Sequence, residues 1–279
     1  NDLRDFIFDN NLQGVKNTDV PRQKTEFSID DYVSISKDKS DYDKIIRNNN
    51  FKNSIFNSPI IKYGEKYNNK NRYINTLPTK VGLQMLGLQI NKDDSYYLTD
   101  DNYINAGFID VELIFQKYLN NKYTPKEIKD KTICNFIATQ GPLENTFYDF
   151  WKLVDEHDCP LIVQVTNFIE GREKCVEYWP QDQGKIDVKD TTSDKLTYTI
   201  TNTEQIIDKN IKTTDLKLNI ITSTNIKNVK HLWYKDWPDH GIPESEEQHT
   251  SFDNLIKKIF EICKTRKTEK PGKIPSVIV

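Results

Sequence analysis

Apolar residues recur at helical spacing in two stretches of the second half of the chain. The first stretch has apolar residues at i, i+3, i+4 and i+7, namely Phe147, Phe150, Trp151 and Val154. Such a stripe is typical of a helix that packs one face against a core. In the second stretch, Ser245 and Gln248 form a capping box. The apolar stripe that follows it is Phe252, Leu255, Ile256, Ile259 and Phe260. We therefore predict two core-facing helices.

Short apolar or alternating runs around these helices predict strands. Pro160–Thr166 and Pro275–Val279 are apolar and β-branched, which is the pattern of a strand buried on both faces. The other predicted strands are Tyr103–Asp110, Phe136–Pro142 and antiparallel strands between Asp187 and Asn228, followed by His231–Tyr234. Strand, helix and strand in this order indicate an α/β domain with some parallel pairing.

The pattern is weaker outside this region. Residues 1–60 are polar with loosely spaced apolar positions, which predicts an N-terminal helical or polar segment ahead of a main domain at 61–279. The stretch from about Val111 to Lys131 is rich in lysine and asparagine and contains Pro125. That composition indicates a surface insertion, to which we assign no role.

Composition narrows the classes of function. The net charge of the 279-residue chain is only −3, so no global field attracts nucleic acid. No apolar run reaches the roughly 18 residues that a transmembrane helix needs. The four cysteines are Cys134, Cys159, Cys175 and Cys263, and no Cys-x-x-Cys pair occurs among them. This scatter excludes a zinc site or a dense disulfide framework, and it predicts a reducing compartment such as the cytoplasm.

One loop carries the most distinctive chemistry. Trp237–Pro243 contains two prolines and a glycine, which exclude it from a helix or a central strand. Rigid flanks around the carboxylate of Asp239 suit a loop that moves as a unit and delivers a proton donor. The alternative is a surface turn whose aromatic residue, Trp237, fills the core.

A second candidate segment lies far upstream. Tyr73 and Asn75 come just before Pro78, in a segment that must be extended or looped. An exposed tyrosine there suits a stacking wall for a flat aromatic ligand, and the alternative is a tyrosine that packs inward. A polar turn with Glu170 and Lys174 follows the buried strand Pro160–Thr166.

Taken together in chain order, these stretches resemble the tyrosine-specific, cysteine-dependent protein tyrosine phosphatases. The matching segments are Asn71–Pro78, Tyr103–Asp110, Phe136–Pro142, Asp149–Trp151, Thr166–Pro180, His231–Tyr234 and Trp237–Ser245. The resemblance implies an α/β fold with a strongly twisted mixed sheet flanked by helices. It also implies hydrolysis of phosphotyrosine in proteins through a cysteinyl-phosphate intermediate, without a metal or another cofactor.

The resemblance also implies roles for individual residues. Asp239 matches the general acid of the family's mobile loop, to which Trp237, Pro238 and His240 also belong. Tyr73 matches the tyrosine that stacks on the substrate ring, and Asn75 matches the position that contacts the substrate backbone. Glu170 and Lys174 match the loop that braces the catalytic arginine and the acid loop.

The family's His-Cys-x5-Arg motif should follow a strand like Pro275–Val279, and the chain stops there. The chain starts at Asn1 rather than at a methionine, so we expect both ends to be cut, and a membrane anchor outside this stretch stays open. We expect the chain as given to be inactive because it lacks the nucleophile. Two alternatives remain: a pseudophosphatase that binds phosphotyrosine without turnover, and a domain that only keeps the fold.

Overall fold

The computed structural model describes residues 68–73, 76, 78, 103–119, 122–235, 237, 242 and 244–279. All of these residues belong to one compact unit, Phe56–Val279. The polar segment expected at 1–60 lies outside the described residues, so its character and its boundary with the main domain stay predictions.

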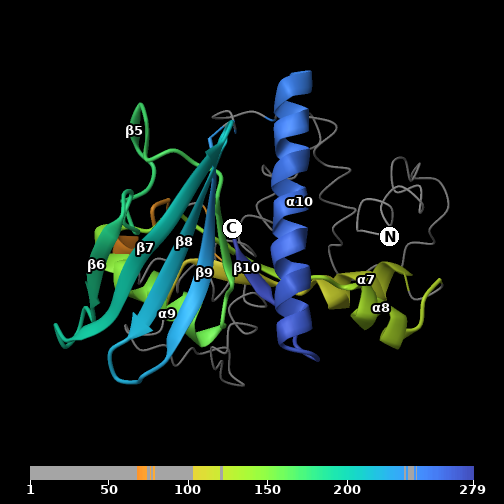
Figure 1. Ribbon diagram of the computed structural model, residues 1–279, viewed down its shortest axis with the longest axis horizontal. Helices are drawn as coiled ribbons and strands as arrows, with labels where there is room; N and C mark the ends of the chain where they lie inside the picture. The colour runs from red at the N-terminus through yellow and green to blue at the C-terminus, as the bar shows by residue number, and fades with distance from the viewer. Residues whose placement is uncertain are drawn as a thin grey trace, which may run out of the picture. The chain divides into compact units, whose positions relative to one another are not determined.

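Eight strands of the described residues form one mixed, twisted sheet (Figure 1). In spatial order they are β1 (Ala106–Ile109), β2 (Asn135–Thr139), β10 (Ser276–Ile278), β3 (Leu161–Gln164), β9 (Ile226–Tyr234), β8 (Ile211–Ile220), β7 (Leu196–Asp208) and β6 (Gly184–Lys189). The four central strands pair in parallel and the outer ones pair antiparallel. The α/β fold and the antiparallel run predicted from the sequence are confirmed.

The central strands β3 and β10 are buried on both faces, as their apolar runs predict. Leu161 and Val163 pack in one core cluster, and Ile162 packs in the other. Successive side chains of a strand point to opposite faces of the sheet, so the two clusters lie on its two faces. The neighbouring strand β10 divides in the same way, with Val277 and Ile278 in different clusters.

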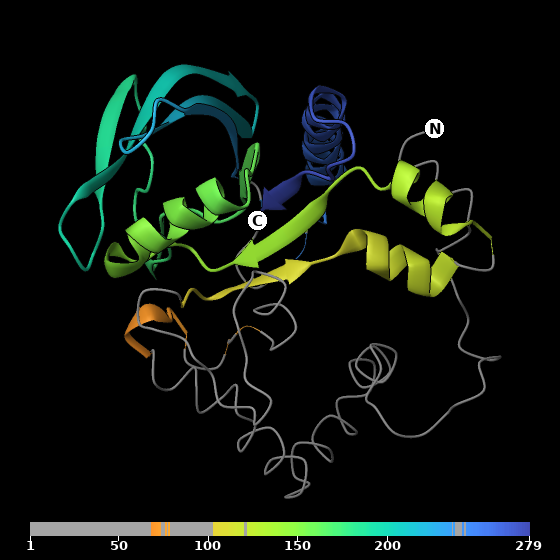
Figure 2. The ribbon, with the colours of Figure 1, turned by 90° about the horizontal axis from the view of Figure 1, so that it is seen from below.

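One helix covers each face of the central strands (Figure 2). The helix α9 (Phe147–Glu156) buries Phe150, Trp151 and Val154 from its predicted stripe. The helix α10 (Glu246–Glu269) buries Leu255 and Ile259 on the other face. Both predicted helices are confirmed. No helix in the described ranges is both long enough and apolar enough to cross a bilayer.

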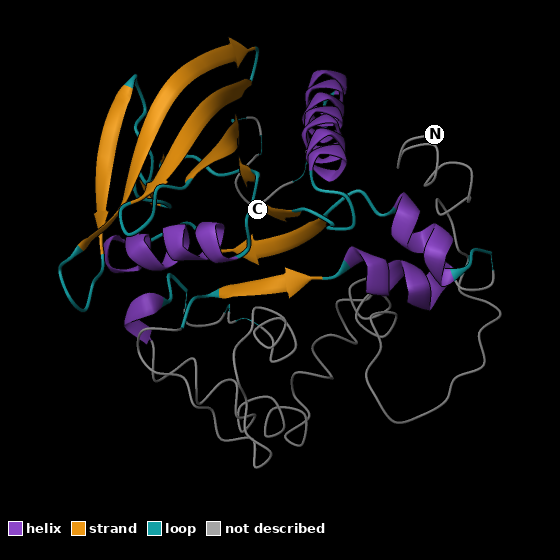
Figure 3. Ribbon diagram, turned by 60° about the horizontal axis from the view of Figure 1, so that its bottom comes forward, coloured by secondary structure: helices purple, strands orange, loops and turns teal. Residues whose placement is uncertain are grey.

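The stretch 111–131, predicted as a surface insertion, is mostly helical. It forms α7 (Val111–Leu119) and α8 (Pro125–Lys131) (Figure 3). Pro125 begins α8, where a missing N–H costs nothing. Thr124 and Glu127 complete a capping box in front of it. The side chain of Ile128 is buried, so α8 packs on the domain.

The remaining elements are short. They are the 3-10 turns η1 (Asn68–Lys70) and η2 (Glu144–Thr146) and the strands β4 (Ile169–Glu170) and β5 (Arg172–Glu173). The two strands form a separate antiparallel hairpin. This hairpin occupies the place of the predicted polar turn, and it leads toward the site described next.

Candidate functional site

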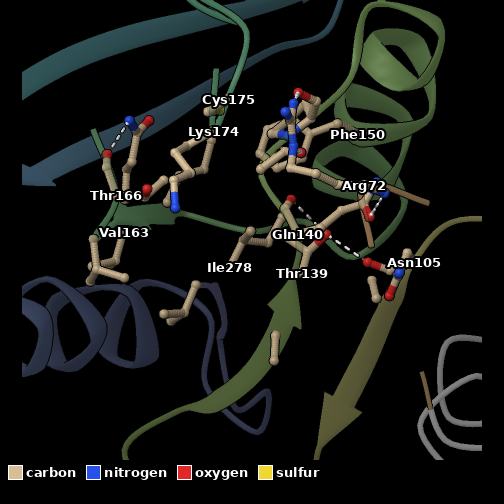
Figure 4. Close-up of a pocket in the computed structure, with 18 of the residues that line it drawn as sticks. Arg72, Asn105, Thr139, Gln140, Phe150, Val163, Thr166, Lys174, Cys175 and Ile278 are labelled. Carbon is tan, nitrogen blue, oxygen red and sulfur yellow. Dashed lines mark hydrogen bonds between the residues drawn. The ribbon is translucent and has the colours of Figure 1, made fainter. Parts of the chain in front are cut away.

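A cavity of about 670 Å³ lies beyond the carboxyl ends of β3 and β10. Its lining includes Tyr73, Thr76, Asn105, the turn Gln140–Pro142, Glu170, Lys174, Cys175, Trp237, Ile278 and Val279. Figure 4 shows Arg72 and Lys174 on different sides of this cavity. Open α/β sheets place their ligand sites at this edge, because the loops after parallel strands meet there.

Arg72 fixes the segment that carries Tyr73. Its Nε donates to the Gly141 carbonyl over 3.1 Å, and Nη2 donates to the Pro142 carbonyl over 2.7 Å. The backbone N–H of Arg72 donates to Gln140 Oε1 over 2.8 Å. Arg72 Nη1 also donates to the Glu173 carbonyl over 3.3 Å, which makes four hydrogen bonds from this residue to other segments of the chain. The arginine therefore ties the Tyr73 segment to the turn after β2.

A buried hydrogen-bond network also anchors the segment that carries Tyr73. Asn71 Oδ1 accepts from the Tyr103 hydroxyl over 2.7 Å and from Asn105 Nδ2 over 3.0 Å. Asn105 Nδ2 also donates to the Thr76 carbonyl over 2.8 Å. Burial raises the pKa of Tyr103 to about 12, so its hydroxyl keeps its proton. Tyr73 thus lies half-buried between two anchored positions and faces the cavity.

The β4–β5 hairpin forms the opposite wall. Glu170 Oε1 accepts from the backbone N–H and the side-chain amide of Asn167, over 3.2 and 3.1 Å. Glu170 Oε2 lies 3.9 Å from Lys174 Nζ. Gly171 has φ +71° at the tip, a conformation that glycine adopts without strain. The predicted pair Glu170 and Lys174 is therefore brought together at the cavity.

Gly141 brings the two walls into close contact. A Cβ placed at Gly141 would lie 2.6 Å from the Lys174 carbonyl and 3.0 Å from Cys175 Cβ. No real Cβ sits so close to backbone, so only glycine fits here. The turn after β2 can therefore pack directly on Lys174 and Cys175, which follow the hairpin.

The four cysteines of the chain are buried in the structure. Cys175 lines the cavity, but burial raises its pKa to about 12, and the nearby Arg72 only partly opposes this. A thiol with that pKa is not a thiolate at neutral pH, and the thiolate is the reactive form. The other three cysteines are buried and free. None of the four is followed by arginine six positions later.

The loop Trp237–Pro243 is described at Trp237 and Ile242. Trp237 is half-buried, lines the cavity and packs edge-to-face on Phe252 of α10, with ring centroids 5.6 Å apart. Its neighbours Pro238, Asp239 and His240 lie outside the described residues, as does Asn75. Trp237 is thus held at the cavity by its contact with Phe252 of α10.

The sequence predicted no role for two arginines of the site. The sequence marks Arg72 only as a neighbour of Tyr73. Its contacts could not be predicted, because its carbonyl partners lie about 70 residues away and follow no local pattern. Arg172 lies with its Cζ 5.4 Å from the centroid of the Tyr73 ring. The one feature of the sequence that indicates a place for Arg172 near the site is its position in the short turn between Glu170 and Lys174.

Comparison with known proteins agrees with this geometry. The family model for protein-tyrosine phosphatases matches residues 67–278. The chain belongs to the protein-tyrosine phosphatase family. The hairpin and the Tyr73 segment fall within the part that matches, as does every residue lining the cavity except Val279.

Several curated phosphatases are similar to this domain. Mouse receptor-type tyrosine-protein phosphatase R is 34% identical over 182 residues, which are 65% of this chain and 23% of that protein. Human receptor-type tyrosine-protein phosphatase eta is 31% identical over 189 residues, 67% of this chain and 12% of that protein. Mouse tyrosine-protein phosphatase non-receptor type 5 is 33% identical over 172 residues, 61% of this chain and 28% of that protein. The chain thus spans less than a third of each of these three relatives.

Proposed function

We propose that a protein carrying this phosphatase domain hydrolyses phosphotyrosine in other proteins through a cysteinyl-phosphate intermediate. The observation that carries the proposal is the cavity beyond β10, which Tyr73 lines together with Glu170 and Lys174. An aromatic wall and a lysine suit a flat ring that carries a phosphate anion. Family membership supports the same substrate chemistry.

The leaving group explains the need for an acid. Tyrosine has a pKa of about 10, so its phenolate leaves poorly. A positioned acid that protonates the bridging oxygen contributes about 10²–10⁴-fold. We assign this role to Asp239, because Trp237, two positions earlier, lines the cavity. Pro238 would stiffen its loop, to which His240 also belongs, and Asn75 would contact the substrate backbone.

We propose that the nucleophile is a cysteine beside the carboxyl end of β10, as the family's His-Cys-x5-Arg motif implies. A thiolate there would attack phosphorus, the phosphorus–oxygen bond to tyrosine would break, and Asp239 would give its proton to the leaving oxygen. Water would then release phosphate and restore the thiolate. Since the 279 residues contain no Cys-x5-Arg motif, we propose that this chain alone does not turn over substrate.

The proposed setting is a reducing compartment. The four cysteines, Cys134, Cys159, Cys175 and Cys263, are free thiols in the structure, which supports that setting. The proposed partners are phosphotyrosine-containing proteins. The net charge of −3 supports no role in binding nucleic acid.

The test uses the chain extended past Val279 by a Cys-x5-Arg segment. We expect phosphate release from phosphotyrosine peptides, and Tyr73→Ala should lower kcat/KM about tenfold because the stacking wall and the depth of the pocket are lost. Selectivity over phosphoserine should narrow as well. Tyr123→Ala, at a half-buried tyrosine before α8, is the matched control and should change neither value.

Three outcomes would count against parts of this proposal. Tight phosphotyrosine binding by the extended chain without phosphate release would favour the binding module instead. Turnover by the 279-residue chain that alkylation abolishes would mean that one of its own cysteines is the nucleophile. A large fall in the melting temperature of Tyr73→Ala with unchanged selectivity would make Tyr73 a core residue.

A further inference from the structure

The helix α7 exposes large apolar side chains. Asp110 Oδ1 accepts from the Leu113 N–H over 2.8 Å, which caps the first turn of the helix. Leu113 is 55% exposed, and Ile114 beside it is 39% exposed. Ile109, at the end of β1, is exposed to the same extent as Ile114. Single exposed apolar residues are common, but three within six residues indicate a contact surface.

Exposed lysines lie on the two elements next to α7. Lys267 of α10 joins α10 to α8, because its Nζ donates to the carbonyls of Asp130 and Thr132, each over 2.8 Å (Figure 1). Around this junction, four lysines are exposed and have no carboxylate of the described residues within ion-pair distance: Lys126, Lys129, Lys264 and Lys273. We call these four lysines together with Leu113 and Ile114 the insertion surface.

Charge is concentrated around the insertion surface. Residues 111–132 and 261–273 contain ten Lys or Arg residues and five Asp or Glu residues, a surplus of five positive charges. The whole chain carries −3, so the remaining residues are strongly acidic by comparison. The local field at this surface therefore attracts anions, although the chain as a whole does not.

The insertion surface lies at the opposite edge of the sheet from the cavity. The helices α8 and α10 end shortly before β2 and β10, and the Asn135 N–H donates to the Pro275 carbonyl over 2.9 Å where these two strands begin. The strand β1 is antiparallel to β2, so α7 also starts at this edge. The cavity lies beyond the carboxyl ends of β3 and β10. A large partner on the insertion surface would therefore leave the cavity open.

From this placement we propose that the insertion surface docks on a membrane that contains anionic phospholipid. The lysines attract the phosphate and carboxylate groups of the lipid headgroups, and Leu113 and Ile114 enter the region between them. The inference goes beyond the proposed function and holds whether or not the domain hydrolyses phosphotyrosine.

The mixture of residue types favours a membrane over other anionic partners. A nucleic acid would engage the lysines but would leave the exposed Leu113 and Ile114 without a partner. Protein interfaces are enriched in aromatic residues and arginine and depleted in lysine, which is the opposite of this surface. Lysines beside exposed aliphatic residues are the pattern of a helix that lies in a membrane interface.

The test measures sedimentation of the 279-residue chain with lipid vesicles. One set is pure phosphatidylcholine, and the other contains about 30% phosphatidylserine. We expect binding to the second set only, with weaker binding in raised salt. Lys126→Gln combined with Lys129→Gln should lower the partition coefficient about 20- to 30-fold, which is about fivefold for each lysine removed. Leu113→Gln should lower it about tenfold, because an apolar side chain no longer leaves water.

A matched control removes two lysines elsewhere. Lys185 in β6 and Lys195 before β7 are exposed and lie far from α8 along the sheet. Lys185→Gln combined with Lys195→Gln changes the net charge by the same amount and should leave the partition coefficient almost unchanged. All of the substituted side chains are exposed, so the melting temperatures of the variants should match that of wild type.

Three results would overturn the inference. One is equal binding to both sets of vesicles, or an equal loss in the two double variants, because neither result depends on the insertion surface. Another is an unchanged partition coefficient in Leu113→Gln, which would mean that α7 does not enter the membrane interface. The third is binding of a poly-glutamate peptide without binding of vesicles, because the surface would then fit an acidic protein.

Discussion

At the scale of single residues, burial fixes the protonation state of some titratable side chains, and His231 is the clearest case. It is fully buried in β9, stacks on Trp179 with ring centroids 3.8 Å apart, and shares a 2.8 Å hydrogen bond with the Tyr178 hydroxyl. Burial lowers its pKa to about 3, with a smaller contribution from the charge of Lys212. His231 is therefore neutral in the folded domain at physiological pH, and it supports the strand that leads to Trp237.

This burial predicts acid sensitivity. The unfolded chain binds a proton on His231 below about pH 6.5, whereas the folded domain does so only near pH 3. Above about pH 6.5 the titration of His231 does not lower the free energy of unfolding. As the pH falls from about 6.5 toward about 3, that free energy decreases, by about 2 kcal/mol between pH 7 and 5. In urea unfolding, His231→Gln should have a lower free energy of unfolding at neutral pH than wild type. Its free energy of unfolding should also fall less steeply between pH 7 and 5. The exposed His249→Gln is the control, and an unchanged slope in His231→Gln would reject the assignment.

At the scale of elements, the N-terminal caps of the helices fix where the preceding loops end. Ser245 Oγ accepts from the Gln248 N–H over 3.1 Å, and Gln248 Oε1 accepts from the Ser245 N–H over 3.2 Å. This capping box was predicted from the sequence, because its residues are three apart. The equivalent box of Thr124 and Glu127 has the same spacing, but the lysine-rich composition around it concealed α8.

The two boxes provide a matched pair of variants. Ser245→Ala and Thr124→Ala should each destabilise the domain by about 1 kcal/mol in urea unfolding, since each removes a side-chain cap. Only Ser245→Ala should also lower kcat in the extended chain, because Ser245 anchors the end of the loop that carries Asp239. Equal kcat values for the two variants would show that the cap stabilises the helix without positioning the acid.

At the scale of the whole molecule, the parallel centre of the sheet determines where the chemistry can occur. Periodicity and β-branched runs predicted β3, β10, α9 and α10, because each is a local pattern. The contacts of Arg72 with Gly141 and of Arg172 with Tyr73 link segments about 70 and 100 residues apart, and no local pattern encodes them. The sequence therefore predicted the fold and the residue types of the site, whereas the pairing of its walls required the structure.

The central claim is that Asp239 protonates the leaving oxygen of phosphotyrosine at this cavity, and its most direct test is the dependence on leaving group. In the extended chain, kcat of Asp239→Asn is compared with wild type for a phosphotyrosine peptide and for an aryl phosphate whose phenol has a low pKa. Circular dichroism confirms that both proteins are folded. The account predicts a loss of about 10²–10⁴-fold for phosphotyrosine and a much smaller loss for the activated ester, which needs no proton. Equal losses for the two substrates would contradict it.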